Sequence, residues 1–170
     1  MHFRKQRAAA RDIFLVLLDT SGSLVARRGL NKAKGLLAGI CRDAYLRRQS
    51  LELVGFGRGN VETFQLARKP AREVDALLDT IQGGGGTPLR AALVHCARRV
   101  RQLARQDPQA AVQIIILTDA RSRDRLNDIA LDAPCHVIDT EQTPVRLGRA
   151  FNLAHALGAR YSHIDTLPLR

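Results

Sequence analysis

IFLVLL at residues 13–18 and VQIIIL at residues 112–117 are the two stretches that decide the fold of this chain. Both are nearly continuous apolar runs, without the alternation of apolar and polar residues that is typical of a strand with one exposed face. Continuous runs of this length are typical of parallel strands that helices cover on both sides. The two stretches therefore predict the central strands of a parallel sheet.

Shorter strand and helix patterns surround these two runs. Residues 51–56 and 61–66 flank the turn GRGN and predict a hairpin whose second strand lies at an exposed edge of the sheet. Further strands are predicted at residues 136–139 and 161–164, and helices at residues 30–44, 74–78, 89–100 and 147–157. Because strands and helices alternate along most of the chain, we expect an α/β fold. It should be a Rossmann-like, doubly wound, mostly parallel sheet with one antiparallel edge strand and helices on both faces.

The composition bounds the kind of protein. The chain has 170 residues, of which 45% are hydrophobic, and this is enough for one domain with its own core. We expect a basic N-terminal segment at residues 1–11 and a single domain over residues 12–170. The longest apolar run is far shorter than the roughly 20 residues that cross a bilayer, and the first residues lack the pattern of a signal peptide. We therefore expect a cytoplasmic protein with no membrane contact, in which Cys41, Cys96 and Cys135 are reduced, buried thiols.

The charge of the chain is strongly positive. The net charge of +11 comes from 27 lysines and arginines against 16 aspartates and glutamates. The arginines are spread over nearly every segment, aromatic residues make up only 4% of the chain, and no spacing typical of a nucleic-acid-binding motif is visible. A diffuse basic surface of this kind favours contact with an acidic protein and argues against a specific reader of nucleic acid.

Both central strands end in an aspartate, Asp19 and Asp119. The carboxyl ends of parallel strands meet at the edge where open α/β sheets bind ligands, so we expect the two carboxylates to lie close together. Ser21 and Ser23 follow the first aspartate, and Thr87 follows a run of four glycines, where it is also predicted to be the N-cap of the next helix. Two carboxylates and three hydroxyls without a soft ligand favour Mg²⁺, with Mn²⁺ as an alternative, and leave a coordination position for an incoming carboxylate.

The order of these elements resembles a known metal site. The stretch DTSGS at residues 19–23, Thr87 after the glycine run, and Asp119 at the end of a hydrophobic strand are similar to the metal-ion-dependent adhesion site (MIDAS) of von Willebrand factor A (integrin I-like) domains. The resemblance extends over residues 13–164, nearly the whole chain. It implies that the three hydroxyls bind the metal, while the two aspartates act directly or through water.

A narrower resemblance is to the C-terminal domain of the D subunit of magnesium chelatase. It rests on FLVLLDTSGS at residues 14–23, AKG at 33–35, DAYLRR at 43–48, GGGTPL at 84–89, VIDTE at 137–141 and LGARYSHID at 157–165. The resemblance implies a subunit, not an enzyme by itself, of an ATP-dependent chelatase that inserts magnesium into a porphyrin or, in related assemblies, cobalt into a corrin precursor. It implies that the partner is an AAA+ ATPase subunit, a large chelatase subunit, or both.

Two departures from that family bear on function. The chain has no GxxxxGK[ST] sequence, so we expect no ATP hydrolysis of that type here and an ATPase on another chain. Position 120 is alanine where the family usually has glycine, and alanine resists a positive φ, which leaves the path of this loop open. We favour a free-standing small protein over an excised domain.

Two other functions stay open. The positive charge leaves room for an accessory role in a nucleic-acid or ribonucleoprotein assembly, which a steep dependence of binding on salt would reveal. A metal-dependent hydrolase is the weaker alternative, because no histidine or glutamate in the recognised motif is placed as a general base.

Overall fold

The structure is a computed structural model that describes residues 11–23, 29–71 and 74–168. The predicted basic segment at residues 1–11 lies outside the described residues, except for Arg11. Among the helices of the described ranges, none has the length and apolar character needed to cross a membrane.

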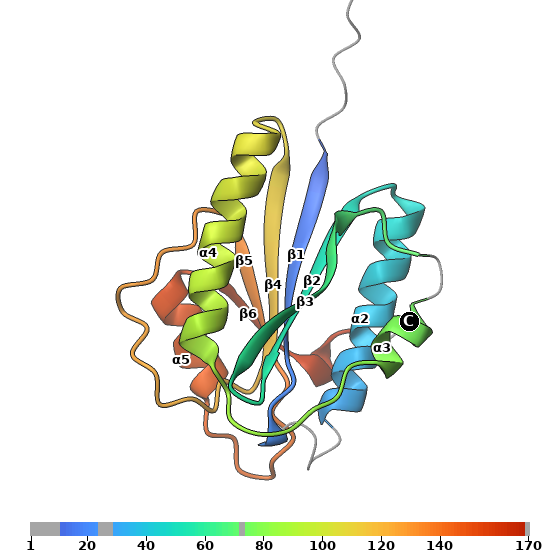
Figure 1. Cartoon of the computed structure of the whole chain (residues 1–170). Helices are drawn as coiled ribbons and strands as arrows, with labels where there is room; N and C mark the ends of the chain where they lie inside the picture. The colour runs from blue at the N-terminus through green and yellow to red at the C-terminus, as the bar shows by residue number, and fades with distance from the viewer. Residues whose placement is uncertain (1–10, 24–28, 72–73, 169–170) are drawn as a thin grey trace, which may run out of the picture.

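One six-stranded sheet organises the molecule, in the strand order β3-β2-β1-β4-β5-β6 (Figure 1). The elements in chain order are β1 (Asp12–Asp19), α2 (Gly29–Leu46), β2 (Ser50–Gly57), β3 (Asn60–Arg68), α3 (Asp75–Asp79), α4 (Leu89–Gln106), β4 (Ala111–Thr118), β5 (Cys135–Asp139), α5 (Arg149–Leu157), β6 (Arg160–His163) and the 3₁₀ helix η1 (Ile164–Thr166). Strand β3 is antiparallel to β2, and the other neighbouring pairs are parallel. The predicted mostly parallel sheet with one antiparallel edge strand is confirmed.

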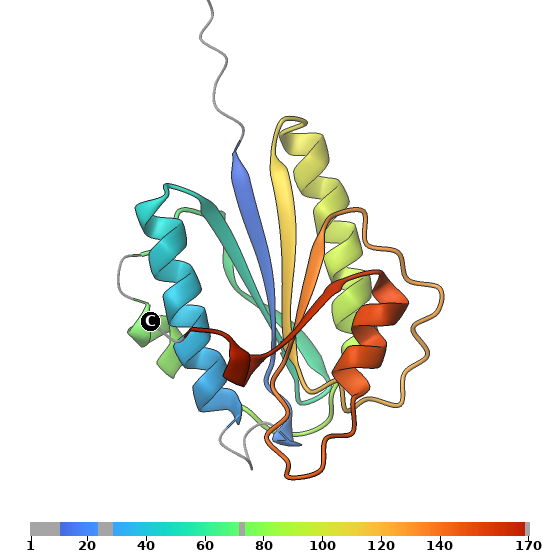
Figure 2. The same cartoon turned by 180° about the vertical axis from the view of Figure 1, so that it is seen from behind.

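The central strand β1 shows why its sequence is apolar throughout. Leu15 and Leu17 belong to the core that packs under α4 and α5, whereas Val16 and Leu18 belong to the core that packs under α2 and α3. All four side chains are 0% exposed. The two helix layers are visible from opposite sides of the sheet (Figures 1 and 2). Helices therefore cover both faces, as predicted.

The connection from β4 to β5 contains no helix, although parallel strands are usually joined by one. Residues 119–134 instead follow an irregular path along the side of the sheet (Figure 1). Leu126, Ile129 and Leu131 are partly buried against the core under α4 and α5. Apolar side chains of an irregular segment thus cover the area that a helix would cover.

The start of α4 differs from the prediction. The helix begins at Leu89, and its N-cap residue is Pro88, whose side chain makes no capping hydrogen bond. Asp124 of the β4–β5 connection accepts a hydrogen bond from the Arg90 amide at 2.8 Å and thereby caps the helix from a distant part of the chain. The prediction that Thr87 is the N-cap is therefore wrong, and the Thr87 hydroxyl is not committed to the helix.

The three cysteines are free thiols. Cys41 and Cys96 are buried, as predicted, whereas Cys135 at the start of β5 is only half-buried. Burial raises the pKa of the Cys41 thiol to about 11, which keeps this thiol protonated at neutral pH.

Candidate metal site

The carboxyl ends of β1 and β4 lie side by side in the middle of the sheet. Leu18 pairs with Leu117 in the parallel register, so that Asp19 lies next to Thr118 and close to Asp119. Here the chain leaves β1 toward β2 on one side and leaves β4 toward β5 on the other. Such a switch point is where open α/β sheets bind ligands.

Asp19 is buried at this switch point, with 0% of its surface exposed. Its Oδ1 accepts a hydrogen bond from the Ser21 amide at 2.8 Å, and its Oδ2 accepts one from the Thr118 hydroxyl at 2.6 Å. Burial raises the pKa of the Asp19 carboxyl to about 6, against the effect of these hydrogen bonds, and the nearby charge of Asp119 raises it further. In the described part of the chain, no lysine or arginine forms an ion pair with Asp19.

Backbone hydrogen bonds fasten the loop after β1 to the glycine run. The Gly22 amide donates to the Gly85 carbonyl at 2.9 Å, and the Gly84 amide donates to the Thr20 carbonyl at 2.7 Å. Gly85 has φ +67°, and a Cβ added to it would lie 2.7 Å from the Arg58 Cα, so a side chain does not fit there. The glycine run is therefore needed for the close contact between these loops and Arg58.

The three predicted hydroxyls lie on these two loops. Ser21 and Ser23 are joined by a hydrogen bond of 3.2 Å between their Oγ atoms. Ser21 is buried, while Ser23 and Thr87 are half-buried. Thr87 comes two residues after Gly85, whose carbonyl accepts the bond from Gly22, and among the described residues its side chain makes no hydrogen bond to the other predicted ligands.

The second aspartate is held by a cation that the sequence did not reveal. Asp119 accepts a hydrogen bond from the Arg121 amide at 3.1 Å, and the Arg121 Nε lies 3.4 Å from the Asp119 Oδ2. The same guanidinium donates from Nη2 to the buried Glu141 Oε1 at 3.0 Å. Arg121 thus joins the β4 end to the β5 end, and its role depends on Glu141, which is 20 positions away in the chain.

Ala120 resolves the open question about the path of this loop. It has φ +53°, which is the left-handed conformation that glycine adopts most easily. The alanine follows the path expected for glycine at a cost of about 1–2 kcal/mol. Thr118 is a second residue missed from the sequence, although a polar residue at the end of an otherwise apolar strand was a visible signal.

The donor set fits a hard divalent cation. All five predicted ligands offer oxygen atoms, and two of these residues are aspartates. Asp19 is buried and has no cationic partner in the described residues. A dication beside it would favour the ionised form. The described residues contain no group of three or more histidines, cysteines, aspartates or glutamates that could hold a metal. Metal binding here would therefore depend on the hydroxyls as well as the two carboxylates.

Comparisons with known proteins point to one family. The pattern of the von Willebrand factor type A domain matches residues 14–121, which is more than half of the chain. The magnesium-chelatase 67 kDa subunit of Chlorobaculum parvum is 28% identical over 95% of this chain, and the chain spans 30% of that subunit's length. An uncharacterized protein of Methanocaldococcus jannaschii is 25% identical over 84% of this chain and 90% of its own length.

A solved structure shows the same fold at low sequence identity. The conserved hypothetical protein BatB of Bacteroides thetaiotaomicron superposes with a TM-score of 0.67 at 16% identity, over 91% of this chain and 90% of BatB. This likeness concerns the fold alone, whereas the sequence likeness to magnesium-chelatase subunits confirms the narrower resemblance. The chain belongs to the von Willebrand factor type A domain family, because the sequence pattern of that family matches residues 14–121 and the fold is the same.

Proposed function

We propose that this chain is a Mg²⁺-dependent docking module that binds a carboxylate of a protein partner. The observation that carries the proposal is the junction of three loops at the switch point of the sheet. The loop of Asp19 is bonded through its backbone to the glycine run before Thr87, and through Thr118 to the end of β4. These contacts support a site shared by the five oxygen-bearing side chains of Asp19, Ser21, Ser23, Thr87 and Asp119.

Each of these residues has a defined role in the proposed site. Ser21, Ser23 and Thr87 would bind the cation through neutral hydroxyls, and Asp19 and Asp119 would balance its charge. When bound, Mg²⁺ would supply an electrophilic coordination position that takes up a carboxylate oxygen. The Thr118 hydroxyl and the Ser21 amide hold the Asp19 carboxylate in one orientation before any cation binds.

We infer the kind of assembly from the relatives. Proteins named magnesium-chelatase 67 kDa and 60 kDa subunits are among them, although the chain covers only part of their length. The proposed role is that of a non-catalytic subunit of a magnesium or cobalt chelatase, in which an AAA+ subunit, the large subunit, or both offer the carboxylate. The net charge of +11 suits an acidic partner surface.

A capture experiment tests the proposal. The immobilised chain should retain a purified AAA+ or large chelatase subunit in Mg²⁺, and Asp19→Ala or an excess of EDTA should abolish the retention. Thr63→Ala, on the exposed face of β3, is the matched control and should leave capture unchanged. Retention that is equal with Mg²⁺, with EDTA and with Asp19→Ala would overturn the proposal.

A further inference from the structure

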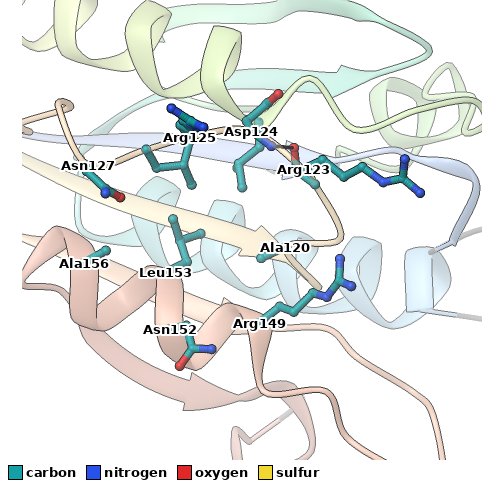
Figure 3. Close-up of a pocket in the computed structure, with 12 residues that line it drawn as sticks. Ala120, Arg123, Asp124, Arg125, Asn127, Arg149, Asn152, Leu153 and Ala156 are labelled. Atoms are coloured by element: carbon teal, nitrogen blue, oxygen red, sulfur yellow. Dashed lines mark hydrogen bonds between the residues drawn. The ribbon is translucent and has the colours of Figure 1, made fainter.

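A hollow of about 480 Å³ lies beside the candidate metal site (Figure 3). Its walls are the first half of the β4–β5 connection, the start of α4 and one side of α5. This volume is within the range of pockets that bind small ligands or single side chains of a partner. Ala120, which follows Asp119 directly, lines the hollow, so the hollow and the metal site share one edge of the sheet.

The wall formed by the β4–β5 connection is held in place by Arg90. The Arg90 guanidinium donates to both carboxylate oxygens of Asp128 at 2.6 and 2.7 Å, and to the Arg125 carbonyl at 2.6 Å. The Arg90 amide donates to Asp124, as described above. Long irregular connections in compact domains are often functional, and this one has a fixed first half. These hydrogen bonds connect this wall of the hollow to the start of α4.

The rim of the hollow is positively charged. Arg123, Arg125 and Arg149 line it with exposed side chains, and none of them has an ion-pair partner in the part of the chain that the structure describes. Asp124, the one carboxylate of the lining, is engaged by the Arg90 amide. Figure 3 shows Arg123 and Arg149 starting above and below Ala120, with both guanidinium groups extending to the same side of it. The rim can therefore offer two cations to the carboxylates of a ligand.

The base of the hollow is apolar. Leu89 and Leu153 are buried there, and Ala120, Leu126 and Ala156 add aliphatic surface. None of the twelve lining residues is aromatic, so the hollow offers no ring on which a nucleic-acid base could stack. An apolar base inside a cationic rim matches an apolar side chain that is flanked by acidic residues.

We propose that this hollow binds a short acidic segment of a protein partner, with one aliphatic side chain in the hollow and flanking carboxylates on Arg123 and Arg149. The inference rests on the proposed function in one respect, because the segment belongs to the partner whose carboxylate binds at the metal site. The contact itself needs no metal.

Fluorescence anisotropy in EDTA tests this contact separately from the metal site. The probes are a labelled peptide of aspartates and glutamates around a central leucine, and the same peptide with glycine at the centre. The leucine peptide should bind several-fold more tightly than the glycine peptide, because it buries the aliphatic side chain. Arg123→Glu/Arg149→Glu should weaken its binding about tenfold.

Matched controls separate the hollow from general charge attraction. Arg98→Glu/Arg105→Glu makes the same charge change at exposed positions of α4 that do not line the hollow, and it should weaken binding less than about twofold. Ala156→Phe, at an exposed position on α5, should fill the hollow and abolish the preference for leucine.

The proposal would be overturned if the leucine peptide did not bind, or if it bound no more tightly than the glycine peptide. An equal loss of peptide affinity in the two charge variants would also overturn it. So would tighter binding of a single-stranded oligonucleotide of equal charge. Peptide binding that survives while Mg²⁺-dependent capture fails would overturn the proposed function alone. Capture that needs Mg²⁺ while the peptide does not bind would overturn this inference alone.

Discussion

The loops that follow β1 and β4 carry the two aspartates of the site, but they are held in different ways. After β1, backbone hydrogen bonds to the glycine run fix the chain, and Asp19 has no cationic partner in the described residues. After β4, side chains from distant segments fix the chain, since Arg121 joins Asp119 to Glu141. One half of the site is held by main-chain hydrogen bonds between two loops that serines and glycines mark in the sequence. The other half is held by side-chain ion pairs that the sequence does not reveal.

Gly85→Ala should disrupt the contact that holds the loop after β1, and should lower the stability of the protein more than the other substitutions considered below. The new Cβ would meet the Arg58 backbone at 2.7 Å in a residue with φ +67°. We expect a loss of about 2–4 kcal/mol in the free energy of unfolding, measured with urea. Gly86→Ala is the matched control, since nothing lies within 4 Å of its added Cβ. Equal effects of the two substitutions would show that the loop contact does not hold the site.

Asp19→Asn should stabilise the metal-free protein at neutral pH. Burial raises the pKa of Asp19 from 3.8 to about 6, so between these two pH values the folded chain holds a proton that the unfolded chain has lost. The free energy of unfolding should therefore fall as the pH rises through this window, by up to about 3 kcal/mol. Because asparagine does not titrate, the Asp19→Asn variant should lack this part of the pH dependence of the free energy of unfolding.

The measurement is urea unfolding in EDTA at several pH values from 4 to 7, with wild type and Asp19→Asn compared at each pH. The difference between the two proteins isolates Asp19 from other titrating groups. A difference that does not change with pH would contradict the buried, cation-free carboxylate described for the first loop.

Arg121→Ala should disrupt the second loop. It would leave the Glu141 side chain, which is 2% exposed, without its cation, although the Thr143 hydroxyl and the Leu147 amide would still donate to it. We expect a loss of about 1–2 kcal/mol of stability by urea unfolding. Arg121→Lys keeps the charge and should recover part of the loss. No loss in either variant would mean that the ion pair does not fix this loop.

Ala120→Gly should have the smallest effect, and its sign is informative. Relief of the left-handed strain at φ +53° exceeds the entropic cost of glycine by a small margin, so we expect a gain of up to about 1 kcal/mol. Ala156→Gly, at an exposed position in the last turn of α5, should instead cost up to about 1 kcal/mol. If thermal unfolding showed that glycine lowers the stability at both positions, the strain assigned to Ala120 would be contradicted.

The sequence predicts the fold because its main signals are local. The two apolar runs, the hairpin turn and the helix periodicities each specify an element, and the aspartates at the strand ends specify which edge carries the site. One prediction failed where the cause is not local. Thr87 does not cap α4, because Asp124 caps it by accepting a hydrogen bond from the Arg90 amide, 34 positions away.

The candidate site too has parts that could be predicted from the sequence and parts that could not. Its two loops could be named from the strand-end aspartates, the serines and the glycine run. Thr118 and Arg121 could not be assigned roles, since their partners Asp19 and Glu141 come from other segments of the chain, the end of β1 and the loop after β5. The hollow beside Ala120 could not be predicted from the sequence either, because an irregular connection between β4 and β5 forms one of its walls.

Calorimetric titration with Mg²⁺ tests whether the loops after β1 and β4 form a metal site. We expect saturable binding of a single Mg²⁺ by the wild type, its loss in Ser21→Ala/Ser23→Ala, and its retention in Thr63→Ala. The serine substitutions remove only hydroxyls, and Thr63 is exposed, so the fold should survive in each variant. Absence of saturable binding in the wild type, or equal binding by the serine variant, would contradict the claim that the loops after β1 and β4 form a metal site.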